Sequence, residues 1–181
     1  MIKHLQATVA HNLRVVVAGT SGITSTSGDL VLNRSDNVFA VAVTVAGKNV
    51  SLGALNNLTL AEATVRSNLT VTSGGNLVFG PTSVDGNLSA KTAGGSITQT
   101  GAILVMGKAI FDAGDGAIDL SNPYNYFLSG VDTNGSSVLI TGDPNAVSRQ
   151  TSAGAFYQQS ITGEFAPVMV SDSFSSGIVT R

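Results

Sequence analysis

The sequence predicts an all-β fold, a parallel β-solenoid (β-helix) with about 20 residues per coil and very little helix, on two observations of spacing and one of alternation. A glycine-led strand phrase recurs at nearly even spacing, starting at Gly75, Gly95, Gly116 and Gly135. A second phrase keeps step with it, starting at Val65, Val84 and Val105. Two phrases in phase indicate one unit stacked on copies of itself, because a single copy cannot bury its apolar face alone.

Strict alternation of apolar and polar residues marks the individual strands. It occurs at 30–32, 41–45, 50–52, 58–60 and 69–71. The Val and Leu side chains at every second place are predicted to point inward, and their Ser and Thr neighbours outward. Residues 57–65 could form a short helix, but the Leu-Thr-Leu alternation within them favours a strand. Glycine-rich turns at 73–76, 93–95 and 132–135 are predicted to supply the positive φ of tight corners.

The repeat pattern divides the chain into three parts. Residues 28–141 are predicted to form the β-helix repeats, and residues 1–27 an amino-terminal coil or cap. The pattern fades after Gly142, so residues 142–181 are expected to form an irregular carboxy-terminal cap or tail. The phrases at Gly28 and Gly47 are one repeat apart, but the next phrase, at Gly75, comes later than the repeat requires. This delay predicts an extra strand in one coil.

Composition excludes several classes of function. Of the 181 residues, 43% are apolar, enough for one continuous core, while only 11% are charged and the net charge is −2. Basic residues are scattered singly, so we expect no nucleic-acid partner. The chain has no cysteine, which excludes disulfides and thiolate metal sites. Polar residues interrupt the first fourteen positions, so no signal peptide is expected, and no apolar run is long enough for membrane insertion.

Several phrases resemble the repeats of filamentous-haemagglutinin-like exoproteins and related bacterial adhesins. They are Asn57-Leu58-Thr59-Leu60, Ser67-Asn68-Leu69-Thr70-Val71, Gly86-Asn87-Leu88-Ser89-Ala90 and Gly95-Ser96-Ile97-Thr98-Gln99-Thr100-Gly101. The resemblance covers roughly residues 28–140, and the last phrase is its most specific part. It implies a right-handed parallel β-helix that is secreted or displayed on the cell surface and binds hosts, surfaces or other copies. The chain departs from that family in its short length and in lacking a recognisable amino-terminal secretion domain, so export would depend on sequence outside it.

Acidic residues give two candidate sites, each with a simpler structural interpretation. Asp112, Asp115 and Asp119 lie close together in the sequence and could bind calcium, but the spacing matches neither an EF-hand nor the nonapeptide calcium repeat, and a solvated turn with an outward strand position explains them better. Together with Asp85 and Asp132 they could also supply the paired carboxylates of a polysaccharide-cleaving enzyme. Such an enzyme also needs positioned basic or aromatic groups, whereas Arg66, Lys91 and Lys108 are isolated in the sequence.

Other motifs are better explained by the solenoid itself. His4 and His11 have no third ligand for zinc, and no nucleophile motif or cofactor loop occurs, so no cofactor is expected. Six Asn-x-Ser/Thr sequons occur, at Asn33, Asn49, Asn57, Asn68, Asn87 and Asn134. Turn asparagines followed by alternating strand residues generate this triplet without any glycosylation. Threonines such as Thr98 and Thr100 raise ice binding as an alternative, but they do not recur in successive coils.

Aromatic residues gather late in the chain and give the best candidate surface. Phe127 is predicted to fill the core, and the other aromatic residues could pack a cap or form an exposed face. Tyr124, Tyr126, Phe156 and Tyr157 are the candidates for self-assembly or partner binding.

The function expected from the sequence is therefore structural. It is a non-enzymatic, adhesive stalk or filament subunit of an exported bacterial surface protein, with end-to-end self-association and a possible host or surface glycan or protein as partner. The alternative is a carbohydrate-binding or polysaccharide-cleaving β-helix protein. Acidic and basic residues that converge on one face would favour the enzyme, and scattered ones the stalk.

Overall fold

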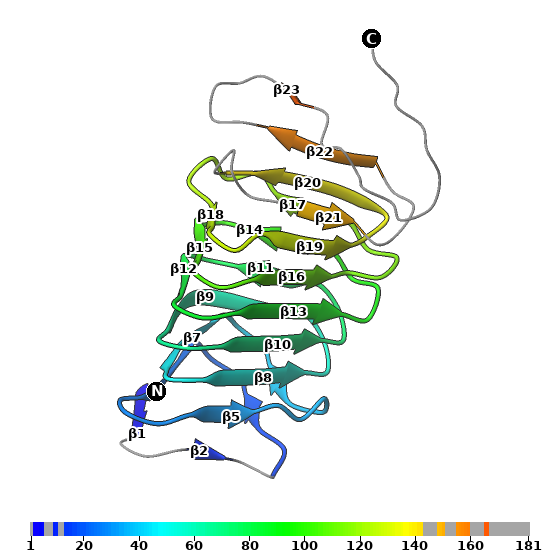
Figure 1. Cartoon of the computed structure of the whole chain (residues 1–181). Helices are drawn as coiled ribbons and strands as arrows, with labels where there is room; N and C mark the ends of the chain where they lie inside the picture. Colours follow the sequence, from blue (N-terminus) through cyan, green and yellow to red (C-terminus); the bar gives the residue numbers. More distant parts are fainter. Residues whose placement is uncertain are drawn as a thin grey trace.

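The chain folds into a stack of parallel β-strands around one core (Figure 1). The computed structural model describes residues 2–5, 9–10, 13–142, 148–150, 155–159 and 165–166, with side chains described for residues 13–142. All regular elements in these ranges are strands, and none is a helix. The predicted fold class, a parallel β-solenoid of short repeated coils, is confirmed; the right-handed winding stays a prediction.

One side of the solenoid is an eight-stranded sheet, here called the front sheet, which faces the viewer in Figure 1. Its strands are β2 (Val9–Ala10), β5 (Leu30–Leu32), β8 (Val50–Ala54), β10 (Leu69–Ser73), β13 (Leu88–Thr92), β16 (Ala109–Asp112), β19 (Val131–Asn134) and β21 (Ser148–Gln150). Every pair in this sheet is parallel. Six of these strands, from β5 to β19, lie within the fully described part of the chain and give six stacked coils there.

The other two sides belong mainly to a thirteen-stranded sheet. The rear face contains β11 (Leu77–Phe79), β14 (Ile97–Gln99), β17 (Ile118–Leu120), β20 (Ser137–Thr141) and β22 (Ala155–Gln159). The side face contains β1 (Ile2–Leu5), β4 (Ser21–Ser25), β7 (Val43–Gly47), β12 (Thr82–Val84), β15 (Ile103–Val105) and β18 (Tyr126–Phe127). Strand β9 (Leu58–Val65) runs across both faces, since its first half pairs with β11 and its second half with β12. Residues 57–65 thus form a strand, as the alternation predicts.

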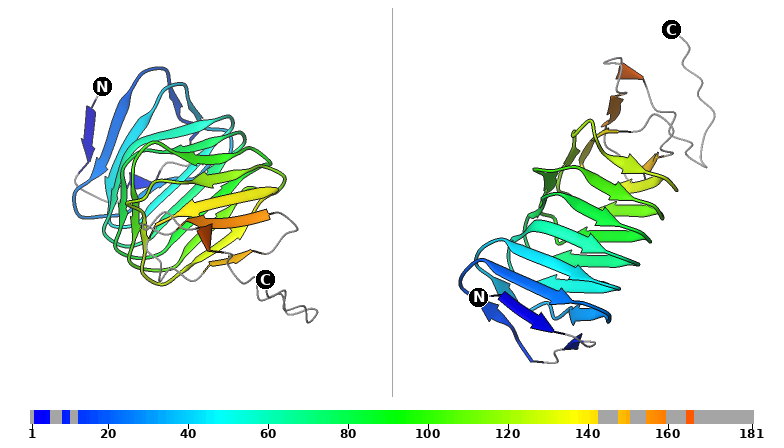
Figure 2. Two further views of the ribbon diagram at one scale, coloured as in Figure 1. Left: turned by 90° about the horizontal axis from the view of Figure 1, so that it is seen from above. Right: turned by 90° about the vertical axis from the view of Figure 1, so that its left-hand side faces the viewer.

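Three short strands lie near the ends of the stack. Strands β3 (Val16–Val17) and β6 (Val38–Phe39) form a separate parallel pair in the amino-terminal coils. Strand β23 (Phe165–Ala166) follows β22 at the other end. Seen along the axis, the coils superpose around a shared interior (Figure 2).

The prediction of an extra strand before residue 65 is wrong. Val50 in β8 pairs directly with Leu69 in β10, which in turn pairs with Leu88 in β13, so this coil is as long as the next one. The phrase at Gly47 leads into the front sheet, whereas the phrase at Gly75 leads into β11 on the rear face. The corner before the front strand and the corner before the rear strand both contain glycine and asparagine, so the sequence pattern alone does not distinguish these two corners of a coil.

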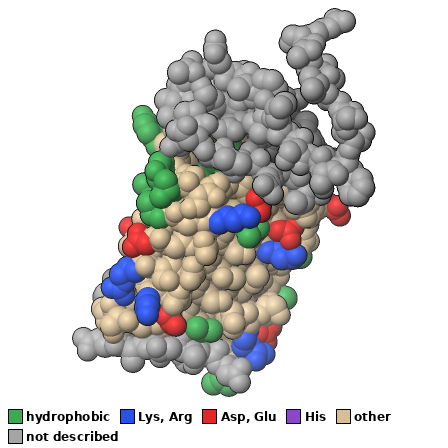
Figure 3. Space-filling model, in the orientation of Figure 1, with side chains coloured by type: hydrophobic (Ala, Val, Ile, Leu, Met, Phe, Trp, Pro, Cys, Tyr) green, Lys and Arg blue, Asp and Glu red, His purple; other side chains and the backbone are tan. Residues whose placement is uncertain are grey.

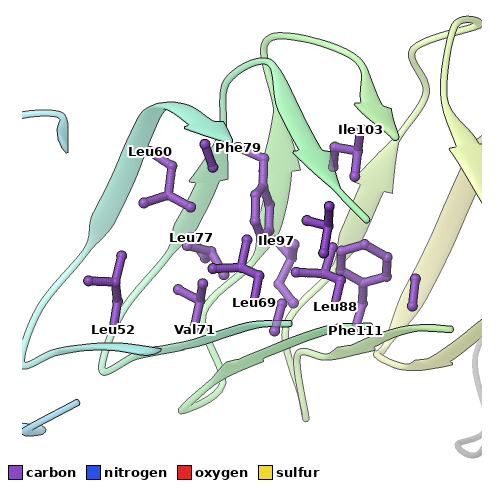
Figure 4. Packing of buried hydrophobic residues seen from close by; sticks show 14 of the residues in the cluster. Leu52, Leu60, Leu69, Val71, Leu77, Phe79, Leu88, Ile97, Ile103 and Phe111 are labelled. Atoms are coloured by element: carbon purple, nitrogen blue, oxygen red, sulfur yellow. The ribbon is translucent and has the colours of Figure 1, made fainter. Parts of the chain in front are cut away.

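Inward side chains form one continuous core from Leu30 to Ile140. Leucines and valines of the front sheet lie against leucines, isoleucines and Phe79 of the opposite faces (Figure 4). The rings of Phe79, Phe111 and Phe127 pack edge to face in series, with centroids 6.1 and 6.0 Å apart. The predicted core position of Phe127 is confirmed. Val41, predicted to point inward, is exposed because strand β7 begins only at Val43.

Asparagines at the corner before the front sheet form a ladder between coils. The side-chain oxygen of Asn49 accepts a hydrogen bond from the backbone N–H of Asn68, and that of Asn68 from Asn87. The Asn87 oxygen accepts from the N–H of Lys108 at 2.8 Å. A similar ladder before the rear strands joins Asn57, Asn76 and Ser96. Each side chain satisfies a backbone donor of the next coil, which explains why asparagine recurs in the sequons at these corners.

Glycines at the corners allow the coils to approach one another. Gly94 has a positive φ of 88°, as predicted, but Gly75, Gly95 and Gly135 do not have this conformation. A Cβ atom on Gly95 would lie 2.5 Å from the carbonyl oxygen of Gly75, far inside the distance of an ordinary contact. The recurring glycines of this corner are therefore required for close stacking rather than for a left-handed turn.

Replacing Gly95 with alanine is expected to destabilise the fold by about 1–3 kcal/mol, because the added methyl group would force neighbouring backbones apart. The matched control is Gly22→Ala in β4, where an added Cβ meets no atom within 4 Å. Its effect should stay within about 0.5 kcal/mol. Urea unfolding followed by circular dichroism measures both. Equal losses for the two variants would contradict the stacking role of Gly95.

Candidate interaction surface

The outward positions of the side face change character along the axis. Thr64, Ser83, Leu104 and Tyr126 occupy the same register position in successive coils. A second row, two residues further along each strand, contains Arg66, Asp85, Met106 and Leu128, which are related by equivalent backbone hydrogen bonds. Both rows are polar in the earlier coils and apolar in the later ones.

The apolar half of these rows is exposed. The exposed fractions are 38% for Leu104, 36% for Met106, 59% for Leu128 and 79% for Tyr124. With the partly exposed Tyr126, these residues are here called the side patch. Figure 3 shows apolar side chains gathered along the left edge of the molecule, where the side face lies. Adjacent parallel strands lie about 4.8 Å apart, so Leu104, Met106, Tyr126 and Leu128 form one contiguous apolar surface, a feature that commonly marks an interaction site. Tyr124 lies in the turn two residues before Tyr126.

The structure brings together two of the four predicted surface aromatics. Tyr124 and Tyr126 belong to the side patch. Phe156 and Tyr157 lie in β22, whose backbone pairs with Val138 and Leu139 on the rear face, and their side chains lie outside the described residues. The four aromatics therefore do not all come from strands of one face.

Sequence reasoning missed Leu104, Met106 and Leu128. A signal for them was present, because residues 102–106 read Ala-Ile-Leu-Val-Met without any polar residue. Strict alternation would place polar residues at 104 and 106, as Ser83 and Asp85 do one coil earlier. An apolar residue at a predicted outward position is the feature to look for.

A buried asparagine supports the backbone beneath the side patch. The Asn125 side-chain oxygen accepts hydrogen bonds from the N–H of Ile103 at 2.9 Å and from the Gln99 amide at 2.8 Å. Its nitrogen donates to the carbonyl oxygens of Leu120 and Thr141, each at 2.9 Å. These bonds hold the turn between Tyr124 and Tyr126 in a fixed position.

A second buried asparagine, earlier in the chain, makes a similar set of hydrogen bonds. The oxygen of buried Asn37 accepts from the N–H of Val15, and its nitrogen donates to the carbonyl of Leu32. Both asparagines stand two residues before a buried phenylalanine, Phe39 in one case and Phe127 in the other. This Asn-x-Phe element occurs twice in the described coils, which is too few occurrences to be recognised as a repeat in the sequence.

Charged side chains on the front sheet form ion pairs between neighbouring coils. Lys91 lies 2.6 Å from Asp112, and Lys108 lies 2.5 Å from Asp132. Asp112 also accepts hydrogen bonds from the Asn134 amide and the N–H of Gly114. In Figure 3, basic and acidic side chains are adjacent on this face.

The three calcium candidates occupy different elements. Asp112 ends β16 on the front sheet, Asp115 lies in the following turn, and Asp119 is in β17 on the rear face. Within residues 13–142, no group of three or more His, Cys, Asp or Glu side chains is arranged to hold a metal ion. His4 and His11, the residues considered for zinc, lie outside the described side chains.

The carboxylates considered for catalysis are also spread over the molecule. Asp85 follows β12 on the side face, Asp119 is on the rear face, and Asp132 is on the front sheet. The two acidic residues that do share a face, Asp112 and Asp132, are each bound to a lysine. This arrangement favours the interpretation that the charges are structural over the interpretation that two carboxylates flank one bond of a substrate.

The pKa of Asp112 is lowered, chiefly by its hydrogen bond with Lys91 and then by those with Asn134 and Gly114, which outweigh partial burial. A carboxylate with a depressed folded-state pKa stabilises the fold above its unfolded pKa of about 3.9, and this contribution is lost as the pH falls through the folded-state pKa. The effect should be small because both partners are partly exposed.

Replacing Asp112 with asparagine is therefore expected to cost less than about 1 kcal/mol at neutral pH. The difference from the wild type should shrink at acid pH, as the pH falls below the unfolded pKa of about 3.9 and through the lower folded-state pKa of Asp112. Urea unfolding at the two pH values measures this change. Asp115→Asn, in the exposed turn, serves as control, and a pH-independent difference for Asp112→Asn would contradict the assignment.

Comparison with known proteins identifies a repeat and no named activity. Residues 67–134 match a family described as "Repeats of unknown function (DUF5649)". This stretch contains the strands from β10 to β19, including Leu104, Met106, Tyr126 and Leu128. The chain is thus similar to these repeats over their solenoid coils. No curated protein and no solved structure matches it. In the described residues, no helix has the length and apolar character needed to span a membrane.

Proposed function

We propose that this chain is a non-enzymatic, adhesive β-solenoid that serves as a stalk or filament subunit of an exported bacterial surface protein. The observation that carries the proposal is the continuous parallel stacking of front-sheet strands from β2 to β21. A stalk requires a rigid, extended body, and stacked coils supply one, because each coil is fixed by backbone bonds to its neighbours. The resemblance of several repeat phrases to filamentous-haemagglutinin-like exoproteins supports secretion and surface display.

The proposed mechanism is geometric. The asparagine ladders and the series of Phe79, Phe111 and Phe127 hold successive coils in one register. The side patch then occupies a fixed place on the later coils of this rigid body. An apolar surface held in this way can bind a host or surface protein, or a glycan, without any reaction taking place.

The alternative is a carbohydrate-binding or polysaccharide-cleaving solenoid. Cleavage needs two carboxylates at a defined separation across one bond. Asp85, Asp119 and Asp132 come from three different faces, so this alternative is less well supported than the stalk.

Electron microscopy of the purified chain over a range of concentrations, with and without calcium, tests the structural part of the proposal. Elongated rods, single or joined end to end, are expected. Compact particles would contradict it, and so would release of reducing sugar from polysaccharides that is lost on Asp132→Asn.

Binding of the chain to octyl-coated beads tests the adhesive part. Replacing Leu104 and Leu128 with serine should weaken binding at least about tenfold, because burial of two leucines contributes more than the roughly 1.4 kcal/mol that a tenfold change requires. The matched control replaces Val16 and Leu55, which are also exposed, with serine. Equal losses in the two double variants would contradict a specific role for the side patch.

A further inference from the structure

At the carboxy-terminal end, strand β23 runs antiparallel to its neighbour β22. Gln158 and Gln159 of β22 pair with Ala166 and Phe165 of β23 in the antiparallel sense. All other strand pairs among the described residues are parallel. The chain therefore reverses direction at the edge where the next parallel coil would otherwise add.

The amino-terminal end of the described stack differs. There the outermost strands of the three sheets are β1, β2 and β3, and each pairs in parallel with a strand of the next coil. The carbonyl oxygens of Val15 and Val17 accept hydrogen bonds from Val38 and Ala40 of the β6 segment. Because successive residues of a strand direct their backbone groups to opposite sides, the N–H and C=O of Val16 face the free edge.

We infer that β23 is a cap that prevents end-to-end stacking of this chain, and that a second copy of the chain is the partner that fits once the cap is displaced. This inference rests on the end-to-end part of the proposed function. Strand β2 of the second copy would pair with the free edge of β21 and continue the front sheet, and β3 would pair with the free edge of β22, both in the same chain direction. A contact between two different ends does not close on itself, so it would build a filament.

The two-residue length of β23 suits this role. A short strand of reversed direction occupies the β22 edge and offers little edge of its own, which is how sheets avoid pairing with other chains. Its removal would leave the backbone groups of Gln158 and Gln159 open to a parallel strand.

The test uses full-length protein with Phe165 and Ala166 both replaced by proline, which cannot donate a backbone hydrogen bond and disfavours strand pairing. We expect single rods for the wild type in sedimentation velocity and electron microscopy. The double variant should form stacks with at least about ten times the wild-type mass, because the open contact propagates. The control carries prolines at Asp172 and Ser173 and should behave as the wild type. Unchanged circular dichroism establishes that the variants are folded.

A further substitution identifies the partner surface. Adding Val16→Pro to the uncapped variant removes an N–H that faces the free edge and leaves the two bonds from β3 to β6 intact. It should return the protein to single rods. Stacking of the wild type itself would overturn the cap while leaving end-to-end assembly in place. A folded, uncapped variant that stays single would overturn both, and stacks that persist with Val16→Pro would overturn the assignment of the partner end.

Discussion

Replacing Phe111 with alanine is expected to lower the free energy of unfolding by about 3–5 kcal/mol, the usual cost of emptying a buried phenylalanine site. Phe111 is fully buried in β16 and lies between the rings of Phe79 and Phe127, so its removal breaks both edge-to-face contacts of the series. The loss should be large because the coil spacing is set by the backbone hydrogen bonds, which keeps the cavity from collapsing. Urea unfolding followed by circular dichroism measures it.

The neighbouring residue provides the control for Phe111. Ile110 lies on the same strand but points outward, with 40% of its surface exposed. Ile110→Ala should change stability by less than about 1 kcal/mol. If the two variants lost the same stability, the core would not be held by this ring series. A reduced yield of rods in electron microscopy for Phe111→Ala alone would connect the core to the proposed stalk.

Replacing Asn125 with aspartate is expected to destabilise the fold by about 3–5 kcal/mol at neutral pH, because it leaves an uncompensated buried charge. The two side chains have nearly the same shape, so packing is conserved. The atom that replaces the Asn125 nitrogen would be a carboxylate oxygen facing the carbonyl oxygens of Leu120 and Thr141. Burial and these carbonyls would raise the folded-state pKa of the new carboxyl group.

The sign of the pH dependence follows from that raised pKa. The protonated carboxyl group can donate to one carbonyl, so the loss relative to the wild type should be smaller below a pH of about 4 and larger above it. Asn76→Asp is the control, since Asn76 also bonds to the next coil but is exposed. Its effect should stay below about 1 kcal/mol. A pH-independent loss for Asn125→Asp would show that the amide network does not support this turn.

The two expected results bear on different parts of the proposed function. The stability of the Phe111→Ala variant tests whether one continuous core keeps the coils in a rigid stack. Loss of the Asn125 network tests whether the turn that presents Tyr124 and Tyr126 is held in place, because octyl-bead binding should then weaken even in molecules that remain folded. A stalk needs the first property, and a binding surface on it needs the second.

Alternation and repeat spacing were enough to predict the strands. The inward positions of Leu52, Leu58, Val71 and Phe127 follow from local rules, since a strand exposes every second side chain to the same side. The regular spacing of the phrases likewise indicates stacked coils. These features depend only on residues that are close in the sequence or one repeat apart.

The candidate surface could be predicted only in part. Tyr124 and Tyr126 were identified because aromatic residues are conspicuous, but Leu104, Met106 and Leu128 were not. Their exposure depends on which corner precedes each strand, and the two corners carry similar glycine and asparagine phrases. Phe156 and Tyr157 were grouped with Tyr124 and Tyr126 because all four lie late in the sequence, although Phe156 and Tyr157 belong to β22 on the rear face.

What the sequence by itself determined is the parallel β-solenoid class, the length of its coils and the residues that fill its core, because periodic patterns report burial directly. Only the tertiary structure decided the register of the coils before residue 65, the gathering of the side patch, the separation of Asp112 and Asp119 onto different faces, and the reversal at β23. Each of these features depends on which residues of neighbouring coils lie side by side, and this in turn depends on where each coil turns from one face to the next. Packing in the core does not restrict the outward side chains of a strand. Which outward side chains lie next to one another is therefore decided only by the stacking of the coils.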